Sequence, residues 1–247
     1  MKLYIIRHAQ SNNNANWLKT GSNKYRDSDP DLTDIGKQQV DHLAKYLRDL
    51  EIDDTALGRD PHNLTGYRIT HVYCSLMVRS IETGLGIAHA LDLPLVALRD
   101  LHETGGIVSG NGMDEPYEGL PGKPRSYFTE HYPDLVITEP FGEEGWWNRP
   151  FEEEEERIER ANRVIDFLLT RHSGTEDRAA IVTHGAFYNH IMRRLIGLPD
   201  RRAWFAMSNT GITSWDFHKD HWENAELLPI IDYTNRVEHL PRHLITP

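Results

Sequence analysis

The stretch KLYIIRHAQS, residues 2–11, decides the fold and stands near the start of the 247-residue chain. Its first part, KLYII, is mostly apolar and rich in β-forming types, which is typical of a short buried strand. Polar residues follow at once, so we expect Arg7 and His8 to stand at the carboxyl end of that strand. Residues 9–31 are rich in Asn, Ser, Gly and Asp, and this composition predicts a long loop.

A second stretch, AAIVTHG at residues 179–185, has the same plan, an apolar run that ends at a histidine, His184. The predicted strands lie at residues 2–6, 71–74, 95–98, 179–183, 212–217 and 227–231, and the predicted helices at residues 33–50, 76–91, 152–168 and 186–195. Thr33 and Ser75 are the expected N-caps of the first two helices. This alternation predicts an α/β fold, a three-layer α/β/α sandwich with a mainly parallel central sheet. Because we find no repeat and no low-complexity linker, we expect residues 1–247 to form a single domain.

The regular pattern breaks down between residues 105 and 150, where Gly, Pro and aromatic residues are frequent. Irregular segments of this length inside compact domains are commonly lids or binding loops, so we expect this insertion to cover a functional site. Within it, Trp146 and Trp147 are expected to pack in the core or to staple the lid. Three basic residues are candidates for contacting a second anionic group of a ligand: Lys123, Arg125 and Arg149. Five consecutive glutamates at residues 152–156 predict the solvated first turn of the next helix.

The composition excludes several classes of protein. The chain has 27 Lys+Arg against 38 Asp+Glu, a formal net charge of -11, whereas a general nucleic-acid binder needs a basic face. A small anionic substrate stays compatible with this charge, because a pocket can be locally positive. Cys74 is the single cysteine, so no intrachain disulfide can form, which fits a reducing compartment. No apolar run approaches the roughly 18 residues of a membrane helix, and the N-terminal apolar run is too short for a signal peptide. We therefore expect a cytoplasmic protein with neither nucleic-acid nor membrane partners.

The predicted strand ends carry side chains suited to phosphoryl chemistry. In parallel sheets, ligand sites form beyond the carboxyl ends of the strands, where this chain places Arg7, His8, Arg79, Glu103 and His184. A neutral imidazole can attack phosphorus and hold the phosphoryl group covalently. Guanidinium groups clamp the oxygens, and a carboxylic acid can protonate the leaving oxygen. The N–H groups of the helix after His184 add anion binding, and nothing in this set requires a metal or another cofactor.

Five short segments form an ordered set of motifs along the chain. Residues 7–11 read RHAQS, residues 32–39 read LTDIGKQQ, residues 74–83 read CSLMVRSIET, residues 101–103 read LHE, and residues 182–185 read VTHG. Each motif alone is weak, whereas the ordered set is specific. The set resembles the Arg-His-Gly signature, the Ser-x-x-x-Arg-x-x-x-Thr segment and the second His-Gly of the histidine phosphatase superfamily, the phosphoglycerate mutase-like family. The resemblance implies the phosphoglycerate mutase-like fold.

By this resemblance, His8 is the nucleophile that becomes phosphorylated, and Glu103 is the general acid that later activates water. Three positions are implied to bind the phosphoryl group: Arg7, Arg79 and His184. Two more match substrate-pocket positions of the mutase branch: Ser11 and Asn14. The implied activity is the metal-independent hydrolysis of a small phosphomonoester through a phosphohistidine.

The chain departs from the family pattern at three places. Ala9 replaces the usual glycine after the nucleophile, which is tolerable unless the position needs a positive φ. Ala186 stands where the mutases commonly have asparagine. After Glu103, residues 104–107 read TGGI, without the basic run that would hold a bisphosphate in a mutase, and this favours a phosphatase. Two alternatives stay open, a mutase that returns the phosphoryl group to another hydroxyl and a non-catalytic binding protein of the same fold. The substrate and the oligomeric state also stay open, a dimer being one option.

Overall fold

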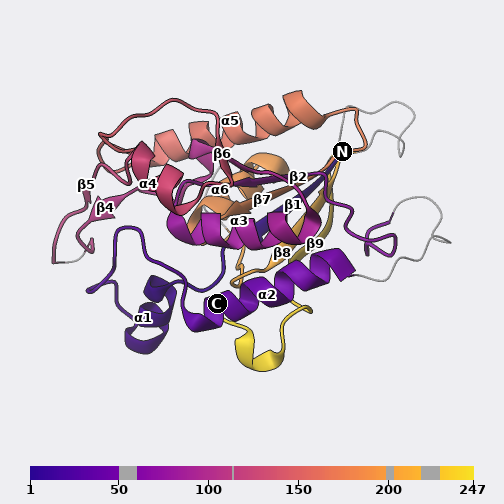
Figure 1. Ribbon diagram of the computed structural model, residues 1–247, viewed down its shortest axis with the longest axis horizontal. Helices are drawn as coiled ribbons and strands as arrows, with labels where there is room; N and C mark the ends of the chain where they lie inside the picture. The colour runs from indigo at the N-terminus through magenta and orange to yellow at the C-terminus, as the bar shows by residue number, and fades with distance from the viewer. Residues whose placement is uncertain (50–59, 113, 199–202, 218–228) are drawn as a thin grey trace.

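The computed structural model describes residues 1–49, 60–112, 114–198, 203–217 and 229–247, and Figure 1 shows their arrangement. The strands of the main sheet are β1 (Lys2–Arg7), β2 (His71–Cys74), β3 (Leu95–Ala97), β6 (Leu135–Ile137), β7 (Arg178–Thr183), β8 (Ile212–Asp216) and β9 (Ile230–Arg236). Their order is β6-β3-β2-β7-β1-β8-β9, with parallel pairing from β6 through β1 and antiparallel pairing of β8 and β9. The sheet is therefore mainly parallel, as predicted.

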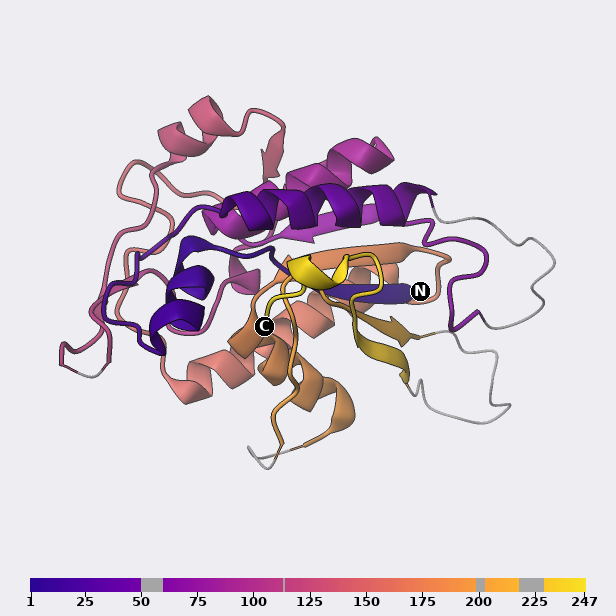
Figure 2. The ribbon, with the colours of Figure 1, turned by 90° about the horizontal axis from the view of Figure 1, so that it is seen from below.

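Helices cover both faces of this sheet, as Figure 2 shows. One face carries α2 (Asp34–Asp49) and α3 (Val78–Leu91), and the other carries α5 (Glu154–His172) and α6 (Gly185–Ile196). Alternate residues of β1 feed the two layers, because neighbouring side chains of a strand point to opposite faces. Tyr4 and Ile6 pack in the cluster with α2 and α3, whereas Leu3 and Ile5 pack in the cluster with α5 and α6. The prediction of a three-layer α/β/α sandwich is confirmed.

Residues 105–150 contain more regular structure than the sequence indicated. They include β4 (Val108–Ser109) and β5 (Glu118–Gly119), which pair antiparallel, helix α4 (Arg125–His131) and strand β6. β6 extends the main sheet beside β3, so part of the insertion belongs to the central layer. The expectation of a wholly irregular segment is wrong, because elements of two to seven residues leave no clear periodicity in the sequence.

A helix also interrupts the loop predicted at residues 9–31. α1 (Asn12–Thr20) begins after Ser11, whose hydroxyl accepts the Asn14 N–H while the Asn14 side chain accepts the Ser11 N–H. It ends at Gly21, which has a left-handed φ of 62°. None of its residues is buried, so no apolar stripe marks the helix in the sequence. The prediction of one long loop is corrected for this reason.

The helix starts confirm one prediction and correct two. The Thr33 hydroxyl accepts an N–H of the first turn of α2 at 3.0 Å and caps that helix as expected. Ser75 does not cap α3, which begins after Met77. Glu152, expected in a solvated turn, is buried and pairs with Arg160 at 2.6 Å. A run of five glutamates cannot reveal which of them faces a cation two turns further along the helix.

The remaining elements are η1 (Arg99–Leu101) and η2 (Arg242–Leu244), two short 3-10 helices. The strand predicted at residues 227–231 is β9, which begins at Ile230, and residues 227 and 228 lie outside the described residues. Position 50, the predicted end of the first long helix, also lies outside them. Among the helices in the described ranges, none is both long enough and apolar enough to cross a membrane.

Candidate active site

The register of two strands brings two histidines together. β1 and β7 are adjacent and parallel, and Arg7 at the end of β1 is in register with Thr183 at the end of β7. A histidine follows on each strand, so His8 and His184 emerge side by side with ring centroids 4.9 Å apart. The His8 N–H donates to Thr183 O at 2.9 Å and ties the two strand ends. The two imidazoles that the sequence placed at strand ends therefore meet at the carboxyl edge of the sheet.

Hydrogen bonds define which nitrogen of His8 carries the lone pair. Nδ1 lies 2.7 Å from the Ala9 carbonyl oxygen, which can only accept, so Nδ1 carries the proton of the neutral ring. Nε2 then accepts the Arg79 Nε–H at 3.3 Å. Burial, followed by the charges of Arg79 and Arg7, lowers the pKa of His8 well below its ordinary value. Ala9 is not among the described residues with positive φ, so alanine fits this position without strain.

Arg79 is a buried cation in the first turn of α3. Its Nη1 lies 3.6 Å from Asp29 Oδ1, and its Nη2 donates to Met77 Sδ at 3.2 Å. Asp29 is also buried and accepts the Val78 N–H at 3.0 Å. Burial raises the pKa of Asp29 to about 6, against the lowering effect of Arg79. Sequence reasoning missed Asp29, because nothing in a loop rich in Asp marks the one that faces inward.

Arg7 and His184 are each fixed by neighbours. Arg7 Nη1 donates to Met207 O at 2.5 Å. Burial lowers the pKa of Arg7 to about 10, so its guanidinium stays charged at neutral pH. His184 Nε2 lies 2.8 Å from the Ser75 hydroxyl, which also accepts the Met77 N–H and is therefore set to donate to the ring. This direction places the proton of the neutral His184 ring on Nδ1. Burial lowers the pKa of His184 well below its ordinary value and keeps the ring neutral.

Three buried nitrogen atoms around His8 have no hydrogen-bond partner within the described part of the chain: Arg7 Nε, Arg79 Nη1 and His184 Nδ1. Buried donors are normally paired, so this concentration of free donors at one point is unusual. Two of them belong to guanidinium groups, which match the oxygens of a phosphoryl group. The arrangement is suited to an anion with several oxygen acceptors.

The Glu103 carboxylate lies at the N-terminus of α6. Its Oε1 accepts the N–H groups of Thr104 and Phe187 at 2.8 and 2.9 Å, and its Oε2 accepts the Ala186 N–H at 3.1 Å. Ala186 contributes through its backbone, so the absence of an asparagine side chain at this position leaves the contact intact. These bonds hold the carboxylate at the mouth of the same pocket that exposes His8.

A pocket of about 340 Å³ is lined by six of the seven predicted site residues: Arg7, His8, Ser11, Asn14, Arg79 and Glu103. His184, the seventh, is fully buried beside His8. Ser11 and Asn14 also bond to each other to begin α1, so their side chains serve the helix as well as the pocket wall. In the part of the chain that the structure describes, no three His, Cys, Asp or Glu side chains have the spacing of metal ligands in this pocket.

Sequence reasoning missed much of the pocket wall, which also includes Trp17, Arg26, Tyr117, Phe151 and Arg157. Arg26 lies over the Tyr117 ring, 5.6 Å from its centroid, and donates to Val108 O at 3.3 Å. Arg157 pairs instead with Glu154 at 3.2 Å. Val108 and Tyr117 come from the 105–150 insertion, which thus contributes to the wall. The sequence shows that residue 26 is an arginine, but it does not show that the Arg26 side chain faces the pocket.

The three basic residues predicted to reach a ligand are not on the pocket wall. Lys123 lies over the Tyr127 ring at 4.6 Å, and Arg125 donates to Ile137 O at 3.3 Å. Arg149 lies over the Trp147 ring at 4.0 Å. Lys123 and Arg125 pack within the insertion, whereas Arg149 also lies 3.3 Å from Nε2 of His102, outside the insertion.

Trp146 and Trp147 pack in the core, one of the two uses expected for them. They are 1% and 4% exposed, and Trp147 packs edge-on against His102 with centroids 4.7 Å apart. Gly106 has a φ of 81°, and a Cβ there would lie 2.1 Å from the Trp147 ring, so only glycine fits. The tryptophans therefore fix the segment that follows Glu103.

The family model of the histidine phosphatase superfamily, branch 1, matches residues 3–227. The chain therefore belongs to the histidine phosphatase superfamily, and the resemblance drawn from the motifs is confirmed. A search of curated proteins gave no match.

Solved structures share the fold. A phosphoserine phosphatase from Entamoeba histolytica in complex with 3-phosphoglyceric acid has a TM-score of 0.58 and 18% identity, covering 97% of this chain and 99% of that one. A mycobacterial glucosyl-3-phosphoglycerate phosphatase in complex with inorganic phosphate has a TM-score of 0.59 and 15% identity, covering 97% and 99%. YhfR from Bacillus stearothermophilus has a TM-score of 0.57 and 18% identity, covering 96% and 98%. At these identities the likeness establishes the phosphoglycerate mutase-like fold alone.

Proposed function

We propose that the protein is a metal-independent phosphatase that hydrolyses a small phosphomonoester through a phosphohistidine on His8. The observation that carries this proposal is the environment of His8 Nε2, a lone pair on a neutral ring that faces Arg79 among unpartnered donors. Membership of the histidine phosphatase superfamily supports it. Two proteins of similar structure also bear the names of phosphatases.

In the first step, His8 Nε2 attacks phosphorus in line with the ester oxygen. The N–P bond forms as the P–O bond to the leaving group breaks. Arg7, Arg79 and His184 donate hydrogen bonds to the three remaining oxygens and offset the charge that they carry. Glu103 in its protonated form gives its proton to the leaving oxygen, which departs as an alcohol.

In the second step, water attacks the phosphorus of the phosphohistidine. Glu103, now a carboxylate, accepts a proton from this water as the N–P bond breaks. Inorganic phosphate leaves, and His8 returns to the neutral ring with its lone pair on Nε2. The same carboxyl group serves in both steps. Backbone N–H groups hold it in the pocket throughout.

The pocket wall favours a substrate with a second anionic group. Within the described residues, Arg26 has no carboxylate at ion-pair distance, so its charge is available to a ligand. The small volume of about 340 Å³ suits a compact phosphomonoester. 3-Phosphoglyceric acid, present in the similar structure from Entamoeba histolytica, combines a phosphate with a carboxylate in this way.

Replacement of His8 tests the proposal. We expect His8→Ala to lower the turnover of an aryl phosphate by about a thousandfold or more, since a nucleophile is lost. The variant should also lose the acid-labile phosphoryl label that the parent protein forms during turnover. His89→Ala, at an exposed position of α3, is the matched control and should keep both. Full turnover by His8→Ala would refute the assigned role.

The same assays separate the alternatives. A phosphatase releases inorganic phosphate from a phosphoglycerate faster than it isomerises it, whereas a mutase does the reverse. The absence of basic residues at positions 104–107 counts against a mutase. A non-catalytic binding protein would release no phosphate from a broad panel of phosphomonoesters. In that case, binding of inorganic phosphate, and its loss on Arg79→Ala, would show whether the pocket binds anions at all.

A further inference from the structure

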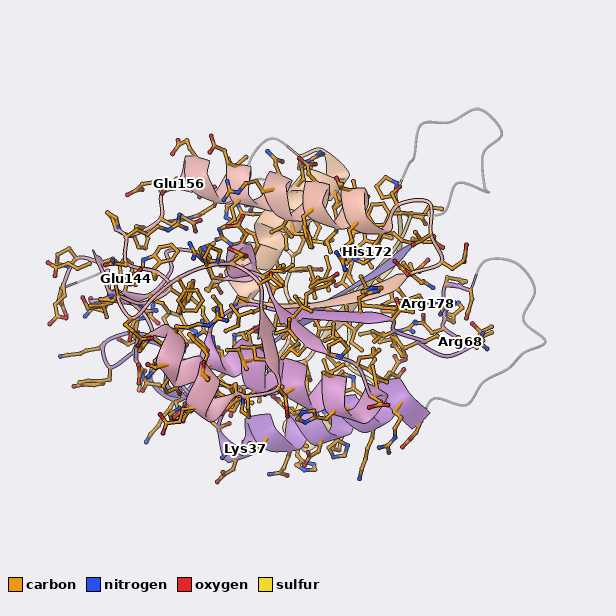
Figure 3. The ribbon with its side chains drawn as sticks, turned by 45° about the horizontal axis from the view of Figure 1, so that its top comes forward. Lys37, Arg68, Glu144, Glu156, His172 and Arg178 are labelled. Carbon is orange, nitrogen blue, oxygen red and sulfur yellow. The ribbon has the colours of Figure 1, made fainter. Side chains whose placement is uncertain are left out.

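A second group of chemically reactive side chains lies at the opposite edge of the sheet. His71 opens β2, His172 ends α5, and Asp177 directly precedes β7. Each of the three brings one potential ligand atom to within 4.8 Å of the other two. Figure 3 shows His172 at the end of α5 remote from Glu156, on the same side of the molecule as Arg178 at the start of β7. This amino edge is far along the strands from the pocket at the carboxyl edge.

The turn between α5 and β7 holds two of these side chains in place. The Thr175 hydroxyl donates to His172 O at 2.7 Å and accepts the Asp177 N–H at 3.0 Å. Asp177 Oδ2 then lies 2.8 Å from His172 Nδ1. The His71 ring lies against the His172 ring, with centroids 4.6 Å apart and planes tilted by 60°. The cluster is thus arranged by a local turn and by the packing of β2 beside β7.

Nδ1 of His172 donates to the Asp177 carboxylate, which can only accept, and the ring can be held in this tautomer or in the other by Tyr73. The Tyr73 hydroxyl lies 3.0 Å from Nε2 of this fully buried ring. A hydroxyl can accept as well as donate, so it holds the ring equally well when Nε2 carries the proton. In that tautomer Nδ1 presents its lone pair toward Asp177. Histidines that ligate metals are commonly oriented by such a hydrogen bond from the second ring nitrogen.

From this geometry we propose that His71, His172 and Asp177 bind a divalent transition-metal ion of the Zn²⁺ type. Two imidazoles and a carboxylate are a donor set of known zinc sites, with a water molecule as the fourth ligand. The metal takes the place of the proton on His172 Nδ1, which is released to solvent. The inference rests on the amino edge alone and is independent of the proposed phosphatase activity.

The dimensions and charges of the cluster fit this ion. Zinc bonds of about 2.0–2.1 Å place neighbouring ligand atoms about 3.4 Å apart, so the widest separation has to close by up to about 1.4 Å. His71 and Asp177 are only partly buried and can make this adjustment by rotating their side chains. Asp177 supplies a negative charge, with 29% of its side chain exposed, and a cavity of about 580 Å³, whose wall also includes Arg171, borders His71.

Titration of the intact, untagged protein with Co²⁺ and with Zn²⁺ tests the proposal. We expect one equivalent of Co²⁺ to give the visible absorption of a four-coordinate site, and Zn²⁺ to displace it. His71→Ala and Asp177→Asn should each abolish this signal, because each removes a ligand. Tyr73→Phe should weaken binding by about 10–100-fold, the usual effect of losing the group that orients a ligating histidine.

A matched control is the exposed pair of His89 and Asp134, whose Nε2 and Oδ2 lie 3.2 Å apart and which no third His, Cys, Asp or Glu of the described residues joins as a ligand. His89→Ala should bind both ions as the parent protein does. Turnover of an aryl phosphate should be unchanged in the variants of His71 and Asp177, which separates this inference from the function proposed for His8. Absence of stoichiometric binding by the parent protein would overturn the metal site. So would undiminished binding by both His71→Ala and Asp177→Asn.

Discussion

The two edges of the central sheet each hold a close pair of histidines, and the neighbours of the two pairs are chemically opposite. At the carboxyl edge, His8 and His184 lie 4.9 Å apart, centroid to centroid, and Arg79 donates to His8. At the amino edge, His71 and His172 lie 4.6 Å apart, and the carboxylate of Asp177 contacts His172. Imidazole can face either a cation or an anion. Because the neighbouring charges differ in sign, we propose a phosphoryl group as the ligand of the first pair and a metal ion as the ligand of the second.

Burial differs between the two pairs as well. His8 and His184 are 3% and 0% exposed, and the guanidinium of Arg79 is buried with them. At the amino edge only His172 is fully buried, while His71 and Asp177 reach solvent. Charge interactions weaken as water approaches. The carboxyl edge should therefore respond far more strongly to the loss of a single charge than the amino edge does.

Among the predictions that compare the two edges, the largest expected effect is that of Arg79→Ala. It removes a buried cation that we propose to hold the transferring group, and kcat for an aryl phosphate should fall by about 10²–10³-fold. The pKa of His8 should rise, because one of the two cations that lower it is gone. Arg194→Ala, on the exposed side of α6, is the control and should have unchanged kcat. If kcat of Arg79→Ala stays within threefold of the parent value, the contrast between the two edges is lost.

The second prediction concerns how the free energy of unfolding depends on pH, which tests the burial of the histidines near the carboxyl edge. The pKa values of three fully buried histidines near the carboxyl edge are well below 6.5: His8, His102 and His184. Below pH 6.5 the unfolded chain binds protons at these positions and the folded chain does not, so the free energy of unfolding falls as pH decreases. Each histidine should lower the free energy of unfolding by about 1 kcal/mol in all between pH 7.5 and pH 5.5, measured by urea unfolding.

The variant His102→Gln checks whether buried histidines cause this fall in the free energy of unfolding. It should make the fall in unfolding free energy shallower, whatever it does to stability at pH 7.5, because one lowered pKa is removed. Asp29 and Glu82 act in the opposite direction, because burial raises the pKa of both carboxyl groups, that of Asp29 to about 6. The histidines with a lowered pKa outnumber them, since burial also lowers the pKa of His190 and of His239 to about 4. Stability that is constant or higher at pH 5.5 than at pH 7.5 would contradict the assignment of neutral buried rings.

The smallest expected effect is that of Arg26→Ala. Arg26 is only partly buried, so its charge is screened, and KM for a phosphomonoester with a second anionic group should rise by about tenfold. kcat should be unchanged, and so should KM for an aryl phosphate that lacks the second group. Lys24→Ala, an exposed cation of the same segment, is the control. An equal rise in KM for both substrates would show that Arg26 acts on the whole pocket rather than on the second group.

Local sequence predicted the parts of the site that lie at the ends of strands. An apolar run followed by polar residues was enough to place Arg7 and His8 at one strand end and His184 at another. The helix after β2 placed Arg79 in the same way. The order of the motifs then identified the superfamily, because five segments in one sequence constrain the topology far more than any single segment does.

Three of the missed features share one property, which is that a polar side chain turns inward. Asp29 lies beside Arg79, Glu152 pairs with Arg160, and Ser75 bonds to His184 instead of capping α3. Polar residues are usually exposed, and a sequence pattern gives no sign of the exceptions. α1 was missed for a related reason, because a helix with no buried residue has no apolar stripe.

Composition and periodicity were sufficient for the class of fold and for placing histidines and arginines at the carboxyl edge of the sheet, and the resemblance of the ordered motifs to a known family was sufficient for the superfamily. Long-range packing alone settled that Arg79 faces Nε2 of His8, that Arg26 lines the pocket wall, and that a second histidine pair faces the other edge. The reason is physical. The contacts that fix these details join residues about a hundred positions apart, as between Tyr73 and His172 or Ser75 and His184, and no local pattern records them.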